Sequence, residues 1–160
     1  MTTREYLNQI NKINFMIETK VEDEVRLRAL ATKITVPTDG ERVKSSPDPD
    51  KMTKVVAKII ELDDEIKAAV ENLIEWRKTL YSQIDAIENP DYHKFLTYKY
   101  TQSLQAKEIS DKMHLSKSAV FIIQADALKE FEEKFGHLYL EANDRREAGN
   151  KNKQEWSNLD

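Results

Sequence analysis

The sequence predicts an all-α protein, on three observations. Only three glycines and four prolines occur among 160 residues, and their clustering leaves long uninterrupted stretches for helices. Hydrophobic residues make up 39% and charged residues 34%, a balance typical of long helices that each bury one stripe. Apolar residues recur at alternating intervals of three and four over most of the first 88 residues, which is the helical period.

Residues 1–88 are predicted to form a long helical hairpin or coiled coil. Its helices are expected over residues 3–34 and 51–88, joined by a connector over residues 35–50 that holds three of the four prolines. The end of the connector supplies a helix start. Asp48 can cap the second helix, Pro49 fits its first position and Asp50 favours the positive helix terminus.

The apolar stripes of the two predicted helices differ in regularity. In the first helix the stripe slips at Lys20 and Glu24 toward Val21 and Val25. In the second helix the heptad is clean, and flanking apolar positions such as Val56 widen it. A wide stripe buries against more than one neighbour, which favours an antiparallel hairpin that pairs again between chains as a homodimer. A parallel dimeric coiled coil is the alternative.

Residues 89–136 are predicted to fold as a compact module of three helices. Asn89 caps the first, which runs from Asp91 to Tyr100 after Pro90. The second starts near Gln105, and a tight turn at His114-Leu115 leads to a third helix capped by Ser116. Gly136 is the expected C-cap of that helix. Residues 137–160 are polar, and we expect a flexible tail in which HLYLEA docks briefly.

The module resembles region four of bacterial sigma factors. The matching residues are Glu108-Ile109-Ser110, the turn at His114, and a helix capped by Ser116 that carries Val120 and Ala127-Leu128. Roughly residues 3–135 also resemble a family of small phage and integrative-element proteins of Gram-positive bacteria. The features that carry this wider resemblance are the 35–50 connector, KIIELDDEI at 58–66 and NPDYHKFLTYKY at 89–100. The resemblance implies regulation of late-gene transcription through a sigma-like helix-turn-helix.

The outward face of the third helix departs from that pattern. With Val120 at the centre of the buried face and about 100° per residue, Ser118, Ile122, Ala125 and Lys129 point away from the core. At the positions of Ser118, Ile122 and Asp126 the family tends to carry basic or polar side chains. Here one is small, one apolar and one acidic. The candidate DNA- or partner-binding residues are Ser116, Lys117, Ser118, Phe121, Ile122, Gln124, Ala125 and Lys129.

Three functions remain open on this evidence. The first is a phage or mobile-element transcription regulator that binds promoter DNA, host RNA polymerase or both. The second is the same scaffold repurposed as an inhibitor that binds another host protein, such as a defence nuclease or a transcription component. This second hypothesis is favoured by the neutral module, in which seven Lys balance seven acidic residues over 91–135, and by the apolar face of Phe121 and Ile122. The third is an oligomeric coiled-coil adaptor.

Other function classes lack a signature in the sequence. There is no cysteine, no glycine-rich phosphate loop and no paired-histidine metal spacing. Asp111 and His114 share a helical face, but a metal site needs three or four ligands. We therefore predict no enzyme, no cofactor and no metal. The absence of a long apolar run or signal segment leads us to expect no membrane association and a location in the cytoplasm of a bacterial host.

Overall fold

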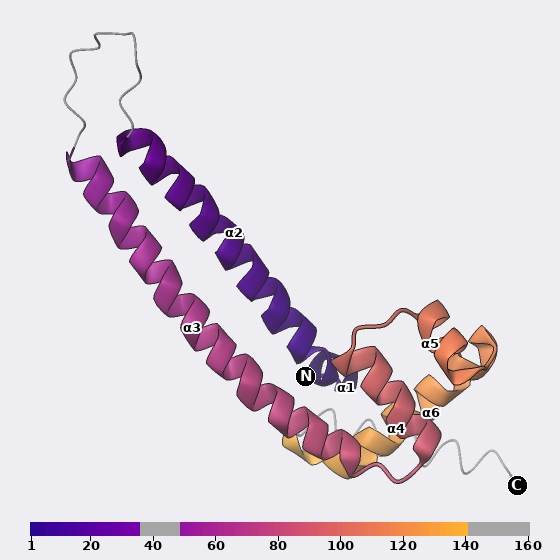
Figure 1. The fold of residues 1–160 in the computed structure, drawn as a ribbon. Helices are drawn as coiled ribbons and strands as arrows, with labels where there is room; N and C mark the ends of the chain where they lie inside the picture. Colours follow the sequence, from indigo (N-terminus) through magenta and orange to yellow (C-terminus); the bar gives the residue numbers. More distant parts are fainter. Residues whose placement is uncertain (36–48, 141–160) are drawn as a thin grey trace, which may run out of the picture. The chain divides into compact units, whose positions relative to one another are not determined.

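The computed structural model describes residues 1–35 and 49–140, and every regular element in these ranges is helical (Figure 1). The all-α prediction is therefore confirmed. The elements are α1 (Thr3–Leu7), α2 (Gln9–Thr35), α3 (Pro49–Asp85), α4 (Pro90–Leu96), the π-helical turn η1 (Thr97–Thr101), α5 (Ala106–Met113), α6 (Lys117–Phe135) and the 3-10 turn η2 (Gly136–Leu138). Most of the predicted connector, including the Asp48 cap, and most of the predicted tail lie outside the described residues.

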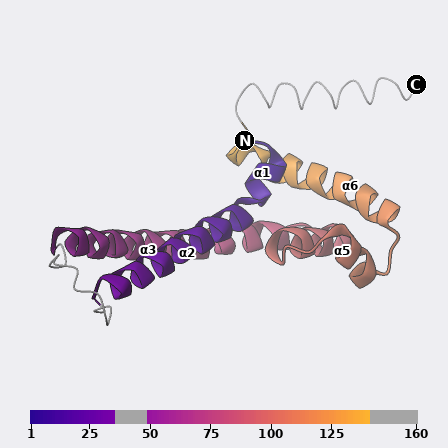
Figure 2. The same ribbon diagram turned by 90° about the horizontal axis from the view of Figure 1, so that it is seen from above.

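The chain divides into two compact units by its contacts. One unit joins residues 1–11 to the described chain from Trp76 onward, and the other holds residues 12–75. Helices α2 and α3 therefore each contribute to both units (Figures 1 and 2). Among the described residues, no helix combines the length and apolar character that a membrane crossing requires.

The ends of the long helices differ from the predicted bounds. The expected single helix over 3–34 is broken at Asn8, whose backbone N–H donates to the carbonyl of Arg4 and closes α1. Helix α3 ends at Asp85 rather than at 88. Its last turn tightens through the N–H of Ile87, which donates to the carbonyl of Ile84 at 3.0 Å. Asn89 then caps α4 and Pro90 opens it, as the sequence predicts.

The core of the first unit combines residues from both ends of the described chain. Leu7 is fully buried at 0% exposure and is joined by apolar side chains from α3, α4 and α6. The buried apolar residues of this unit are Tyr6, Leu7, Ile10, Leu80, Ile84, Ile87, Phe95, Leu96, Tyr100, Ile109, Val120, Ala127 and Phe131. The N-terminal eleven residues are thus part of the core that supports the three-helix module, although spacing alone assigned them to the hairpin.

Tyr6 contacts side chains from several parts of this core. Its ring packs edge-on against Trp76, with centroids 5.0 Å apart, and stacks on Tyr139 at 4.2 Å. The side-chain amide of Gln83 donates to its hydroxyl at 2.9 Å. The hydroxyl of Tyr139 in turn donates to Thr3 Oγ1 at 3.1 Å. The turn after α6 therefore docks onto α1.

Gly136 is the C-cap of α6, as the sequence predicts, although not in the conformation that usually favours glycine there. Its φ of −55° is right-handed, so it does not end α6 in the left-handed conformation that favours glycine. Instead Gly136 is buried, and a Cβ at this position would lie 2.9 Å from a methyl carbon of Leu140. The glycine permits the close approach of the docked turn, a role that backbone capping rules do not detect.

The second unit consists of the antiparallel segments of α2 and α3 between residues 12 and 75. Lys20 pairs with Glu65, and Arg28 Nη2 lies 3.4 Å from Asp63 Oδ2. The later residue of α2 thus pairs with the earlier residue of α3, as expected for helices that run in opposite directions. The buried apolar residues of this unit are Ile13, Val55, Ile59 and Leu62. This geometry is compatible with the predicted hairpin.

The predicted slip of the α2 stripe is wrong. Lys20 and Glu24 keep the positions that face α3 and are half-buried, whereas Val21 and Val25 are exposed. Two ion pairs explain this: Lys20 pairs with Glu65, and Glu24 accepts from Arg28 Nε at 2.6 Å. The heptad of α2 therefore keeps its register through two positions that carry polar side chains, Lys20 and Glu24.

We predict that Leu7→Ala lowers the free energy of unfolding by about 3 kcal/mol, because it opens a cavity in a fully buried site. The measurement is urea unfolding followed by circular dichroism. Phe15→Ala is the matched control on α2, where the ring is exposed and its removal should have an effect below about 0.5 kcal/mol. Equal effects of the two substitutions would show that residues 1–11 are not part of the core.

Stability should also fall at alkaline pH through Tyr139. Burial raises the pKa of its phenol to about 12 and outweighs the opposing hydrogen bond to Thr3, and Glu132 and Tyr6 make smaller raising contributions. An unfolded tyrosine ionises near pH ~10, so this contribution is complete below about pH 10 and is lost as pH rises to about 12. We therefore expect the stability of the natural protein relative to Tyr139→Phe to be lower at about pH 11.5 than at about pH 9. Lysine titration cancels in this difference, and a constant difference would contradict the prediction.

Candidate functional site

The candidate site is the surface of α6 that follows the tight turn after α5. Helix α5 starts with a capping box, in which the N–H of Gln105 donates to Glu108 Oε2 at 2.7 Å. It ends at His114, which adopts the left-handed conformation with φ 54° and ψ 41°. The N–H of Leu115 donates to the carbonyl of Ser110 at 3.1 Å, and the Ser110 hydroxyl donates to the carbonyl of Leu115. These bonds fix the direction in which the chain leaves α5.

Ser116 sets the start of α6 as the sequence predicts. Its hydroxyl oxygen accepts from the N–H of Ala119 at 3.2 Å, and its backbone is extended. The core face of α6 consists of Val120, Ala127 and Phe131, which are all at most 1% exposed. Helix α5, the turn and α6 have a geometry compatible with a helix-turn-helix, in which the second helix presents its N-terminal half to solvent.

Most of the predicted site residues come together on the exposed side of α6. Ser116, Lys117 and Ser118 are exposed at its N-terminus, where free backbone N–H groups favour anions. Phe121 and Ile122 follow at 58% and 64% exposure. The remaining predicted residues divide: Ala125 and Lys129 are exposed, whereas Gln124 is half-buried. Gln124 lies about 40° from Val120 around the helix, so the core face takes up part of its side chain.

Asp126 is exposed on α6, and its carboxylate lies near Tyr92 of α4. Burial raises the pKa of Tyr92, and the carboxylates of Asp126, Glu130 and Asp91 raise it further. The acidic residue that weakens the match to a DNA reader therefore lies beside α4. Spacing alone did not reveal this contact, because Tyr92 and Asp126 lie in different helices.

Sequence reasoning also missed a cationic position on α5. The ammonium of Lys112 lies 5.4 Å from the centre of the Tyr98 ring in η1, a cation–π contact. The signal for it was weak, since one lysine and one tyrosine fourteen positions apart have no characteristic spacing. Lys112 and Lys117 lie on either side of the turn, and both are exposed. They are also the lysines closest in sequence to the start of α6.

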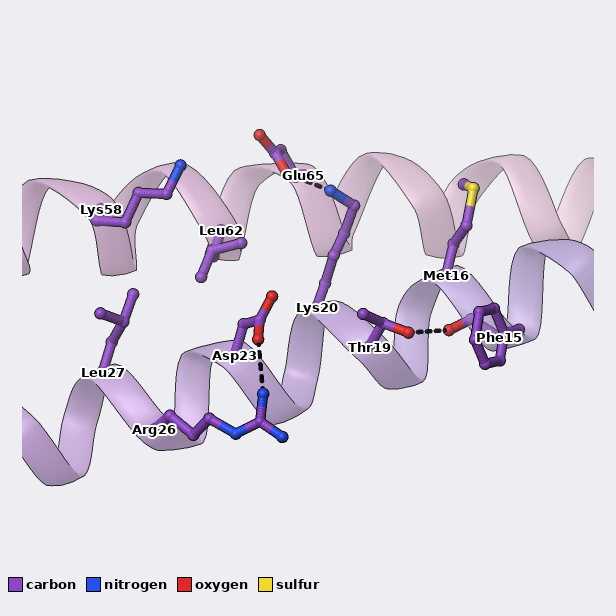
Figure 3. Close-up of a pocket in the computed structure, with 10 residues that line it drawn as sticks. All are labelled: Phe15, Met16, Thr19, Lys20, Asp23, Arg26, Leu27, Lys58, Leu62 and Glu65. Carbon is purple, nitrogen blue, oxygen red and sulfur yellow. Dashed lines mark hydrogen bonds and ion pairs between the residues drawn. The ribbon is translucent and has the colours of Figure 1, made fainter.

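A second concave surface lies between α2 and α3 in the unit formed by residues 12–75 (Figure 3). Phe15, Met16, Leu27 and Leu62 supply its apolar lining. Its charged residues are used in ion pairs: Lys20 with Glu65, and Arg26 Nη1 with Asp23 Oδ1 at 3.1 Å. The hydrogen bond from Lys20 and its charge lower the pKa of Glu65. Among the described residues, no three His, Cys, Asp or Glu side chains gather to hold a metal ion.

The comparisons with known proteins place the chain in a family. A family model described as "Protein of unknown function (DUF1492)" matches residues 40–132, more than half of the chain, and the chain belongs to this family. Neither a curated protein nor a solved structure matches the chain significantly. The matched range includes all of α3 to α5 and α6 as far as Glu132, so it contains both helices of the candidate site.

We predict that His114→Gly stabilises the protein and that His114→Val destabilises it. The left-handed conformation costs an L-residue about 1–2 kcal/mol and costs glycine nothing sterically, although glycine also loosens the unfolded chain by about 0.5–1 kcal/mol. The expected change in unfolding free energy is therefore about +0.5 kcal/mol for glycine and at least about −1 kcal/mol for the β-branched valine. Thermal unfolding of the three proteins measures this. If valine were tolerated as well as glycine, the left-handed turn would be wrong.

Proposed function

We propose that this protein is a transcription regulator of a phage or mobile element that acts in the bacterial cytoplasm. Its helix-turn-helix would contact promoter DNA, alone or together with host RNA polymerase. The observation that carries the proposal is the capped start of α6 after a fixed turn, with Ser116, Lys117 and Ser118 exposed together. Hydroxyls, an ammonium and free N–H groups at a helix terminus are the groups that bind DNA phosphates.

The resemblance to sigma-factor region four supports the same function. In a helix-turn-helix the second helix enters the major groove with its N-terminal residues at the base edges. In this chain Ile122 and Ala125 occupy that exposed side, and an apolar side chain there contacts the methyl group of thymine rather than a hydrogen-bonding base edge. The balance of seven lysines and seven acidic residues in 91–135 leaves little general attraction to phosphates. We therefore propose weak binding that RNA polymerase strengthens.

The test measures binding of the full chain to a labelled mixed-sequence 30-bp duplex and to duplexes selected from a randomised pool. We expect binding at ~50 mM salt that weakens steeply by ~200 mM. Lys117→Ala should reduce the slope of log affinity against log salt by about one, since it removes one phosphate contact. Lys54→Ala, an exposed lysine of α3 in the other unit, is the matched control and should leave the slope unchanged. Absence of binding at ~50 mM salt would overturn the proposal.

A second candidate function is the binding and inhibition of a host protein. It is favoured by the adjacent side chains of Phe121 and Ile122, which are more than half exposed on a module without net charge. Exposed aromatic and aliphatic pairs of this kind anchor protein interfaces. The two functions use the same helix and share Ile122, but only the DNA-binding function needs Lys117.

Capture from a nuclease-treated bacterial lysate separates the two functions. A protein-binding role predicts one stoichiometric partner, identified by mass spectrometry, that is lost with Ile122→Asp and retained with Lys117→Ala. A DNA-binding role predicts instead that Lys117→Ala weakens binding and lowers the salt slope in the duplex assay, a substitution to which partner capture is insensitive. Capture that survives Ile122→Asp would exclude this surface as the partner site.

A further inference from the structure

Helix α3 carries a second stripe beside the one that faces α2. The first stripe consists of Val55, Ile59, Leu62, Ile66, Ala69 and Leu73. Each member of the second stripe directly follows one of these residues and so lies about 100° around the helix from it. The members recur at intervals of four and three and all belong to the unit of residues 12–75: Val56, Ile60, Asp63, Lys67, Val70 and Ile74. The four apolar members are between 38% and 56% exposed, so packing within the chain leaves this stripe open.

The open stripe continues onto α2. Val56, Ile60 and Asp63 line one groove together with Ile59 of the first stripe and with Arg28, Ala31 and Thr32 of α2. Val55, Ile59 and Leu62 of the first stripe are nonetheless buried. The unit therefore has one apolar surface that is used internally and another that is presented on its outside. A row of four large apolar side chains spanning about 27 Å of helix is long enough for a helix of a partner.

The order of residues in the open stripe is symmetric about position 65. Val56 and Ile74 lie nine residues from Glu65 on either side, Ile60 and Val70 lie five, and Asp63 and Lys67 lie two. When two such helices pack antiparallel with a two-fold axis at this position, each apolar residue meets an apolar residue. Asp63 meets Lys67 of the second copy, and this pair occurs twice. Opposite charges at facing positions specify register.

A parallel arrangement in register gives the opposite result. It places Asp63 against Asp63 and Lys67 against Lys67 in the middle of the stripe, which like-charge repulsion disfavours. Asp63 is already 3.4 Å from Arg28 of its own chain and its side chain is 42% exposed, so its carboxylate has room for a second cation. The charge pattern therefore selects both the partner and the direction.

We propose that the open stripe of α3 binds a second copy of this chain, antiparallel and with a two-fold axis at Glu65. The interface is isologous, since each copy contributes the same six residues. It buries Val56 against Ile74 and Ile60 against Val70 of the other copy, with Asp63 and Lys67 paired at the centre. This proposal does not rest on the proposed function, because it concerns the unit of residues 12–75 alone.

Light scattering on the full chain tests the association. Specific interfaces reach at least micromolar affinity, so at about 100 µM protein we expect twice the monomer mass; the monomer is 18.7 kDa. Ile60→Asp should give monomer with unchanged helicity, since Ile60 is exposed within the chain. Phe15→Asp, an apolar residue outside the stripe, should remain dimeric. A natural protein that is monomeric at this concentration, or a dimer that survives Ile60→Asp, overturns the proposal.

The charge pair is tested separately. Lys67→Glu places like charges at both central pairs and leaves the apolar residues in place. We expect it to weaken association at least about tenfold, with a smaller effect at high salt because dissolved ions screen the interaction between the charges. Lys58→Glu is the matched control, on the opposite side of α3 from the stripe, and should leave association unchanged. If Lys67→Glu associates as tightly as the natural protein, the central pairing is wrong.

Cysteine cross-linking tests the direction, because the natural chain has no cysteine. In the double variant Ile60→Cys/Val70→Cys the two positions face each other across the axis, so mild oxidation should give a covalent dimer. In either single variant the two cysteines lie about 15 Å apart along the helices and should not react. A covalent dimer from the single variants would show a parallel arrangement and overturn the antiparallel register.

Discussion

The packing of Tyr6 is the interaction on which the first unit depends. Its ring touches Trp76 and Tyr139, and its hydroxyl is bound to Gln83, so three separate segments, α1, α3 and the turn after α6, meet at one side chain. Because this cluster lies under Phe131 of α6, the N-terminal turn supports the same helix that carries the candidate site. An element at the start of the chain therefore fixes the angle at which a surface more than one hundred residues later is presented.

The candidate site combines a well-specified scaffold with an unusual surface. The scaffold is set by local bonds: the capping box at Gln105, the left-handed His114 and the Ser116 cap. None of these bonds uses the outward face, so residues such as Ile122 are free to vary without loss of the fold. This separation makes one geometry compatible with either of the two proposed functions, and the distinction between them lies in a few exposed side chains.

The long helices show how polar residues control apolar packing. Lys20 occupies a position that faces α3 because Glu65 compensates its charge there, and this holds the register of the whole stripe. Beside it on α3, Asp63 and Lys67 interrupt the open apolar stripe at its centre. Purely apolar stripes permit several registers and directions, whereas one facing ion pair favours a single one. Charge thus supplies specificity that hydrophobic area alone does not.

The sequence by itself determined the helices and the direction of most side chains on them. Helical spacing predicted that Val120 and Phe131 point inward and that Ile122 points outward, and the Ser116 cap was visible, because these features depend on neighbours within four residues. Only the tertiary structure decided that Tyr6 belongs to the core of the module and that Asp126 lies near Tyr92 of α4. Such contacts join residues that are distant in sequence, and their partners are fixed by the path of the whole chain rather than by any local period.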